Sequence, residues 1–181
     1  AHINDCMQDE NYRHAARRLM LNEQAPTLSV PNVDLQAYAD SLIARYSNTA
    51  LKHRTWQIAM DGSQKLPQRM LDSVCWHLAH GSRFDLLALG IAGWMRYVGG
   101  IDERGQSIDI SDPLLADIQH SVQNSAEGQE RVSALLSLEA IFGADLPQNP
   151  EFVRAVNTAY ALLLARGAKY SVAHTLKSTA C

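Results

Sequence analysis

The segment from Arg83 to Val98 (RFDLLALGIAGWMRYV) most limits the folds open to this chain, because it is the most hydrophobic stretch of the sequence. Its apolar residues surround a helical wheel almost completely, and a helix of that kind is buried on nearly every side. Gly90 and Gly93 fall on one face of the predicted helix, where the missing side chains would let a neighbouring helix approach closely. The segment therefore predicts one central buried helix, with the other elements packed around it.

Helical periodicity, with apolar residues at i, i+3 and i+4, continues through nearly all of the remaining chain. Asn32 or Asp34 is expected to cap the second helix. Gly62 and Gly81 are expected to end the third and fourth helices, and Pro67 to open the fourth. The predicted helices cover residues 12–22, 34–46, 48–61, 67–80, 113–124, 127–142 and 151 to about 168.

The stretch 99–112 (GGIDERGQSIDISD) interrupts this pattern. Arg104-Gly105 is a turn signal, and the alternating Ile108 and Ile110 favour a short hairpin near 99–111. The carboxylates of this stretch are predicted to be solvated: Asp102, Glu103, Asp109 and Asp112. No βαβ alternation occurs, so the chain has no room for a nucleotide-binding sheet. The predicted fold class is all-α, a multi-helix domain covering residues 1–181.

Composition excludes several classes of protein. The chain has 181 residues, of which 46% are hydrophobic, and this suits one globular domain with its own core. Its net charge of −3 and its scattered basic residues argue against a nucleic-acid partner. The lack of a leader and of a long apolar run argues against a membrane location. Three irregularly spaced cysteines predict reduced thiols in a cytoplasmic protein, and no metal-ligand signature is present.

Residues 53–69 (HRTWQIAMDGSQKLPQR) contain more polar side chains of different kinds than a connecting loop needs. If the predicted helix continues to Asp61, one of its faces carries His53, Gln57 and Asp61, with Arg54 on an adjoining stripe. The break after Asp61 and the following proline would leave Lys65 on a rigid corner. A lysine held near a carboxylate can anchor the hydroxyls or the carboxylate of a substrate. A capped helix with a solvated polar face would account for the same residues.

Several stretches resemble the polyol-specific long-chain dehydrogenase/reductase family. They are EQAPTL at 23–28, the segment 53–69, LGIAGWMRY at 89–97 and DLP at 145–147. The resemblance extends from near residue 1 to about residue 168. Within this family, which includes the mannitol dehydrogenases, the chain is more similar to the fructuronate reductase (D-mannonate oxidoreductase) branch.

The resemblance implies a cytosolic, NAD-dependent enzyme of two domains. An N-terminal Rossmann-like domain would bind the cofactor, and a helical C-terminal domain would cover the substrate. This chain resembles the helical domain alone, and its lack of an initiator methionine suggests that it is cut from something longer. The family's catalytic signature, Lys-x4-Asn-x2-His, is then expected upstream of Ala1. No catalytic, cofactor-binding or metal-binding residue is expected within the chain itself.

The resemblance also assigns roles in substrate binding. Lys65 matches a lysine that contacts the distal oxygens of the substrate. Gln57 stands where mannitol dehydrogenases have an arginine, so Arg54 or His53 is expected to help meet a carboxylate, while Asp61 helps to orient the sugar chain. The leading hypothesis is the substrate-binding domain of an enzyme that interconverts D-fructuronate and D-mannonate by hydride transfer with NAD. Mannitol, tagaturonate and arabinitol are alternative substrates, and a non-catalytic helical module that binds a ligand or a protein is an alternative of another class.

Overall fold

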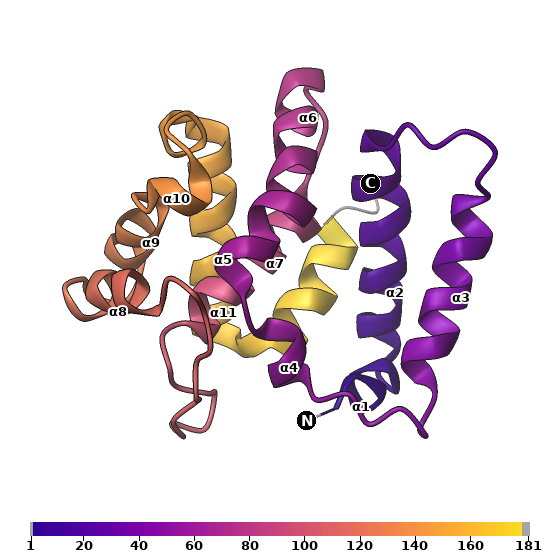
Figure 1. Ribbon diagram of the computed structural model, residues 1–181, viewed down its shortest axis with the longest axis horizontal. Coiled ribbons are helices and arrows are strands. Elements are labelled where there is room, and N and C mark those ends of the chain that lie inside the picture. Colours follow the sequence, from indigo (N-terminus) through magenta and orange to yellow (C-terminus); the bar gives the residue numbers. More distant parts are fainter. Residues whose placement is uncertain (1, 179–181) are drawn as a thin grey trace.

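The computed structural model describes residues 2–178, and this part of the chain is an assembly of helices, as the sequence predicts (Figure 1). The helices, with π and 3-10 turns marked η, are α1 (Ile3–Met7), α2 (Glu10–Arg18), η1 (Leu19–Gln24), η2 (Ala25–Thr27), α3 (Leu35–Ser47), α4 (Thr55–Ala59), α5 (Gly62–Leu66), η3 (Pro67–Leu71), α6 (Asp72–His80), α7 (Asp85–Tyr97), α8 (Leu115–Gln123), α9 (Gln129–Leu136), α10 (Glu139–Phe142), η4 (Leu146–Gln148) and α11 (Pro150–Ser178). Within residues 2–178 no helix is both long enough and apolar enough to cross a membrane. Cys6 and Cys75 carry free thiols.

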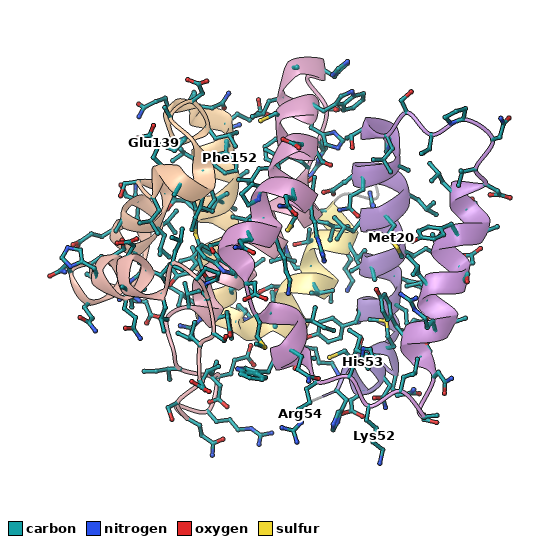
Figure 2. All side chains as sticks on the ribbon, in the orientation of Figure 1. Met20, Lys52, His53, Arg54, Glu139 and Phe152 are labelled. Atoms are coloured by element: carbon teal, nitrogen blue, oxygen red, sulfur yellow. The ribbon has the colours of Figure 1, made fainter. Side chains whose placement is uncertain are left out.

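Helix α7 lies at the centre of the core, as its apolar sequence predicts. Leu87, Ile91 and Met95 are completely buried, and the long helix α11 packs along α7 with Phe152 and Val156 equally buried (Figure 2). Burial of such side chains is the main favourable term in folding, at about 1.5–3 kcal/mol each. These two helices therefore form the support on which the other elements rest.

The two glycines of α7 differ in what they contact. A Cβ on Gly90 would lie 2.6 Å from the Cε atom of Met70, so this glycine makes room for a methionine side chain. A Cβ on Gly93 would meet nothing within 4 Å. The close approach that the sequence suggests for both glycines is thus found at Gly90 alone.

The helices α2 and α3 pack side by side on one flank of the molecule (Figure 1). Asp34 caps α3, as predicted, because its side chain accepts a hydrogen bond of 2.9 Å from the amide of Ala37. Arg17 of α2 forms an ion pair of 2.7 Å with Asp40 of α3. Ala39 is the residue that α3 buries fully, so this helix lies at the periphery of the core.

The helix boundaries around residues 48–81 differ from the prediction. The helix expected over 48–61 is reduced to α4, and Gly62 begins α5 instead of ending a helix. From Gly62 the helical path continues through η3 and α6 to His80, where Gly81 ends it with φ 61°, as predicted. Pro67 therefore lies inside the path and does not open it. The π-helical turn at η3 accommodates the proline, which lacks an N–H and would clash with the carbonyl four residues earlier in a regular helix.

Two other elements differ from their predicted form. Residues 127–142 form α9 and α10, separated at Ser137 and Leu138, instead of one helix. Near 99–111 the structure has a single antiparallel bridge between Ile101 and Ser107 instead of a hairpin with two strands. This loop is closed by a turn in which the side chain of Asp102 accepts two backbone hydrogen bonds. These side-chain bonds accompany two backbone bonds of 2.8 Å across the loop, from Asp102 to Gln106 and from Ile108 to Gly100.

Helix α11 extends beyond its predicted end and changes direction at Gly167. This glycine has φ 73° and ψ 172°, a conformation that residues with a side chain rarely adopt. Oε1 of Glu103 accepts a hydrogen bond of 2.6 Å from the amide of Ala168, where the second half of α11 begins. Glu103 is exposed in this loop, as predicted, and it also caps the second half of α11.

Candidate functional site

The corner between α4 and α5, residues 56–65, is the centre of the candidate site. Asp61 occupies the left-handed region with φ 56° and ψ 34°, which aspartate tolerates better than most residues with a side chain. A Cβ on Gly62 would lie 2.1 Å from Nε1 of Trp94. The glycine is therefore needed for its contact with Trp94, and the sharp turn is made by Asp61.

Lys65 lies in the last turn of α5, and its ammonium group is held over the end of α4. Its Nζ atom donates hydrogen bonds to the backbone oxygens of Ile58, at 3.2 Å, and of Met60. Its backbone amide donates to the oxygen of Asp61 at 3.0 Å. An ammonium group has three N–H donors, so one donor remains for a ligand.

The other predicted site residues lie just before the corner. Gln57 and Arg54 form a capping pair at the start of α4, in which Oε1 of Gln57 accepts a bond of 3.3 Å from the amide of Arg54. His53 precedes α4 and accepts a backbone bond of 2.9 Å from Ile3. The side chains of His53, Arg54 and Gln57 are exposed, and Figure 2 shows the first two at one end of the molecule.

The expected arrangement of these residues on one helical face is wrong. Helix α4 spans five residues, so His53 comes before it and Asp61 comes after it. The structure brings Arg54 to Gln57 and Lys65 to the backbone of Asp61, within two successive turns. Because tertiary contacts set the ends of α4, the four-residue spacing of the sequence does not control which side chains share a surface.

Residues 109–112, here called the tether, were expected to be a solvated loop but bind the corner at three points. Nε1 of Trp56 donates to the backbone oxygen of Asp109, and the amide of Asp61 donates to the backbone oxygen of Ser111 at 3.0 Å. Oδ2 of Asp112 accepts a bond of 2.9 Å from the amide of Ser63. The one local signal for these bonds is the Asp112-Pro113 pair, which predicts a helix cap but not a second partner.

Asp112 is the residue of the tether that acts through its side chain. Its Oδ1 atom accepts a bond of 2.9 Å from the amide of Leu114, next to the start of α8, while Oδ2 holds Ser63. One carboxylate thus joins the beginning of α8 to the beginning of α5. Asp112 lies two residues before Leu114, which is the N-cap residue of α8, so the predicted cap is displaced from the helix start. Its contact with Ser63 is one that the sequence did not reveal.

The interior side of the corner contains polar groups in an acidic environment. Within residues 2–178, Oγ of Ser63 and Nε1 of Trp94 are buried without a hydrogen-bond partner. Burial raises the pKa of Tyr97, and the nearby carboxylates of Asp109, Asp112 and Asp61 raise it further. The hydroxyl of Tyr97 therefore stays protonated at neutral pH.

The EQAPTL stretch has a structural role that sequence reasoning missed. Glu23 is buried, and its two carboxylate oxygens accept bonds of 2.9 and 2.7 Å from the amides of Leu86 and Leu87, so it caps the start of α7. Burial raises its pKa, and the two amides partly offset that effect. Nε2 of His77 donates to the backbone oxygen of Glu23 at 2.7 Å, and its Nδ1 accepts from Ser82 at 2.8 Å. Glu23 therefore stabilises the start of the central helix α7. Its role is structural and separate from that of the corner.

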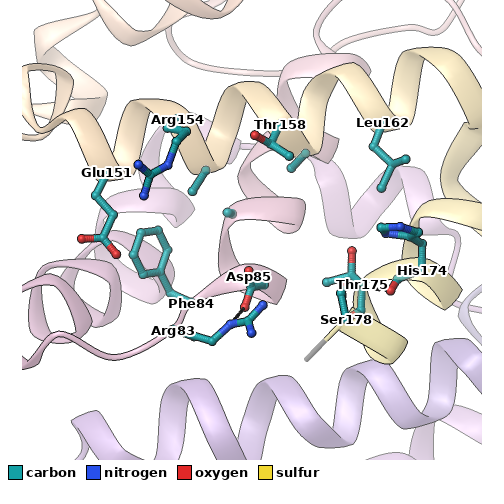
Figure 3. A pocket seen from close by; sticks show the side chains of 13 residues that line it. Arg83, Phe84, Asp85, Glu151, Arg154, Thr158, Leu162, His174, Thr175 and Ser178 are labelled. Atoms are coloured by element: carbon teal, nitrogen blue, oxygen red, sulfur yellow. Dashed lines mark hydrogen bonds and ion pairs between the residues drawn. The ribbon is translucent and has the colours of Figure 1, made fainter. Parts of the chain in front are cut away.

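Three cavities in the described part of the chain lie away from the corner. Figure 3 shows one of about 370 Å³, lined by residues from the start of α7 and from both halves of α11, with Arg83 paired to Asp85 at 2.8 Å. Two others involve the ends of α2, α6 and α11. None of these three cavities is lined by a residue of the corner. Among the described residues, no three histidine, cysteine, aspartate or glutamate side chains are grouped so that they could hold a metal ion.

Comparisons with known proteins agree with the resemblance seen in the sequence. The chain is 71% identical to an uncharacterized oxidoreductase, YdfI, and 56% identical to D-mannonate oxidoreductase, both of Escherichia coli (strain K12). The two alignments cover 95% and 94% of this chain but 35% of each relative. The chain therefore spans about a third of the length of these relatives.

Solved structures and family models lead to the same group. The structure of Pseudomonas fluorescens mannitol 2-dehydrogenase, a ternary complex with NAD and D-mannitol, matches with a TM-score of 0.89 and 32% identity, over 97% of this chain and 35% of that one. The model of the mannitol dehydrogenase C-terminal domain matches residues 1–164. The chain belongs to the mannitol dehydrogenase C-terminal domain family.

Proposed function

We propose that this chain is the substrate-binding domain of a cytosolic, NAD-dependent oxidoreductase that interconverts D-fructuronate and D-mannonate by hydride transfer. Support for the substrate class comes from the 56% identity to D-mannonate oxidoreductase. Support for NAD and a polyol-like ligand comes from the structural neighbour, whose complex contains NAD and D-mannitol. The N-terminal Rossmann-like domain and its Lys-x4-Asn-x2-His signature are part of this proposal.

The observation that carries the proposal is the ammonium group of Lys65. Two of its donors are engaged by the oxygens of Ile58 and Met60, and the third can meet a sugar oxygen. The exposed Arg54 and His53 supply positive charge at the neighbouring turn, which suits a sugar that carries a carboxylate. Gln57 and Asp61 would complete the wall that orients the sugar chain.

The fold supports a division of labour between the two proposed domains. A dinucleotide binds in the crevice at the edge of a parallel sheet, and residues 2–178 contain no sheet, so we place the cofactor pocket mainly in the N-terminal domain. The bound nicotinamide would supply hydride exchange with the sugar carbonyl. The helical domain would hold the sugar in reacting geometry, which can account for a large part of a rate enhancement.

The proposal is tested by Lys65→Ala in the full-length protein. Loss of a contact to the sugar should raise the KM for fructuronate or lower kcat/KM by about 10- to 100-fold, which corresponds to one charge-assisted hydrogen bond. The dissociation constant for NADH should stay unchanged, because Lys65 lies outside the proposed cofactor pocket. A shift in NADH affinity without a change in the sugar constants would contradict the assignment.

The identity of the sugar is decided by a substrate panel. Fructuronate, tagaturonate, fructose and xylulose should be compared with NADH by kcat/KM, and fructuronate is expected to be preferred. Equal turnover of fructose, which lacks the carboxylate, would favour the mannitol alternative. Failure of the full-length protein to reduce any of these sugars would favour the non-catalytic module.

A further inference from the structure

We infer that Asp112 is a positioning residue for Lys65, acting by fixing the corner on which the ammonium group is held. This inference rests on the proposed function, because it assigns to Asp112 an effect on sugar binding. Asp112 itself lies on the tether and holds the corner from the side of α8.

The first step of the argument is that the corner needs external support. Asp61 is in the left-handed region, which is disfavoured for a residue with a side chain and persists when surrounding contacts determine it. The helix before it, α4, has five residues and stands apart from the longer helical path that begins at Gly62. A helix this short has little stability of its own, so its placement against the start of α5 depends on contacts from outside.

The second step is that the tether supplies this support on both sides of Asp61. Trp56 is bound before the turn, the amide of Asp61 within it and the amide of Ser63 after it. Asp112 makes the last of these contacts, and its other oxygen is anchored on Leu114. The carboxylate is therefore fixed at both oxygens and restrains the start of α5.

The third step is that the placement of Lys65 depends on the same geometry. Its backbone belongs to α5, but its Nζ atom is bound to the oxygens of Ile58 and Met60, which belong to the end of α4. A change in the angle between the two helices moves the Lys65 backbone relative to these acceptors. Release of Ser63 from Asp112 would thus make the position of the Lys65 ammonium group less well defined. It would not remove any group that is proposed to touch the sugar.

The variant that isolates this effect is Asp112→Asn in the full-length protein. The amide has nearly the same shape but only one acceptor oxygen, so its NH2 group would face the amide of either Ser63 or Leu114. We expect the KM for fructuronate to rise about tenfold, the effect of leaving one part-buried N–H without an acceptor. The change in kcat should be smaller, and the dissociation constant for NADH should remain unchanged.

Asp102→Ala is the control, because an asparagine at this position would keep the one oxygen that accepts both bonds. Oδ1 of Asp102 also accepts two backbone bonds, both of 2.8 Å, from Arg104 and Gln106 in the same loop. These bonds close a local turn and do not reach the corner. The control should leave the KM for fructuronate unchanged, and an equal rise in both variants would overturn the inference, because general loosening of the loop would then explain it.

A double-mutant cycle tests whether Asp112 acts through Lys65. If it does, the variant Lys65→Ala/Asp112→Asn should have the same KM for fructuronate as Lys65→Ala, within about twofold. Additive effects would overturn the inference while leaving the proposed function intact. An absence of any effect of Lys65→Ala on the sugar constants would instead overturn the proposed function.

A second variant covers the case in which Asp112→Asn does not fold. Trp56→Phe removes the indole N–H that binds Asp109 and keeps an aromatic ring in α4. A higher KM for fructuronate, with an unchanged midpoint of thermal unfolding, would support the role of the tether. An unchanged KM in this soluble variant would overturn it.

Discussion

Two glycines near Trp94 have opposite requirements, although both lie in helices. Gly62 is held against the indole ring, where a Cβ would fall 2.1 Å from Nε1, and Trp94 is buried and packs on Phe142. Gly93, the residue before Trp94, has nothing within 4 Å of its Cβ position. The value of each glycine is therefore set by its neighbours in space and not by its helix.

Replacement of each glycine by alanine should change stability in opposite directions. Gly62→Ala must displace the indole ring, so we expect a loss of about 1–3 kcal/mol in the free energy of unfolding. Gly93→Ala should stabilise α7 by up to about 1 kcal/mol, because alanine is the better helix former. Midpoints of thermal unfolding compare the variants directly. A Gly62→Ala protein as stable as wild type would contradict the described contact with Trp94.

At the scale of single elements, the sequence correctly predicted the features that depend on neighbouring residues in the chain. The apolar run of α7, the Asp34 cap of α3 and the Gly81 end of α6 all depend on residues within one or two turns. The boundaries near the corner were wrong because they depend on distant residues. Trp94 determines why residue 62 is a glycine, and the tether determines where α5 begins.

The candidate site shows the same division between local and distant causes. The sequence and its resemblance led to the corner and to Lys65, but the face predicted for His53, Gln57 and Asp61 required a helix longer than α4. The supporting role of Asp112 lay beyond sequence reasoning, because its partner Ser63 is 49 residues away. Residues that contact a ligand can be suspected from their chemistry, whereas residues that hold them in place require the fold.

The cap on the second half of α11 can be tested by replacing Glu103. Glu103 accepts the hydrogen bond of Ala168 just after the bend at Gly167, and a lost cap typically costs about 1 kcal/mol. In Glu103→Gln, which keeps an acceptor but loses the charge, hydrogen exchange of the amides at 168–172 should increase slightly. In Glu103→Ala the increase should be larger, with the amides at 152–164 unchanged as an internal control. Equal exchange in all three proteins would show that the bend needs no cap.

At the scale of the whole molecule, the proposed division of labour predicts that the chain is inactive alone. The isolated 181-residue chain should show no NADH binding in a fluorescence titration and no reduction of fructuronate, because residues 2–178 offer no sheet for the dinucleotide. Circular dichroism should confirm that the tested sample is helical. Measurable NADH-dependent turnover by this helical sample would contradict the proposed division of labour.

The two backbone oxygens that hold Lys65 also affect the entropy of ligand binding. A lysine side chain loses up to about 2 kcal/mol of rotational freedom when it is fixed in one conformation. Because Ile58 and Met60 already restrain the ammonium group, this loss occurs when the chain folds and not when a ligand arrives. A sugar would then meet a donor whose position is already set, and its affinity would not be reduced by ordering a flexible side chain.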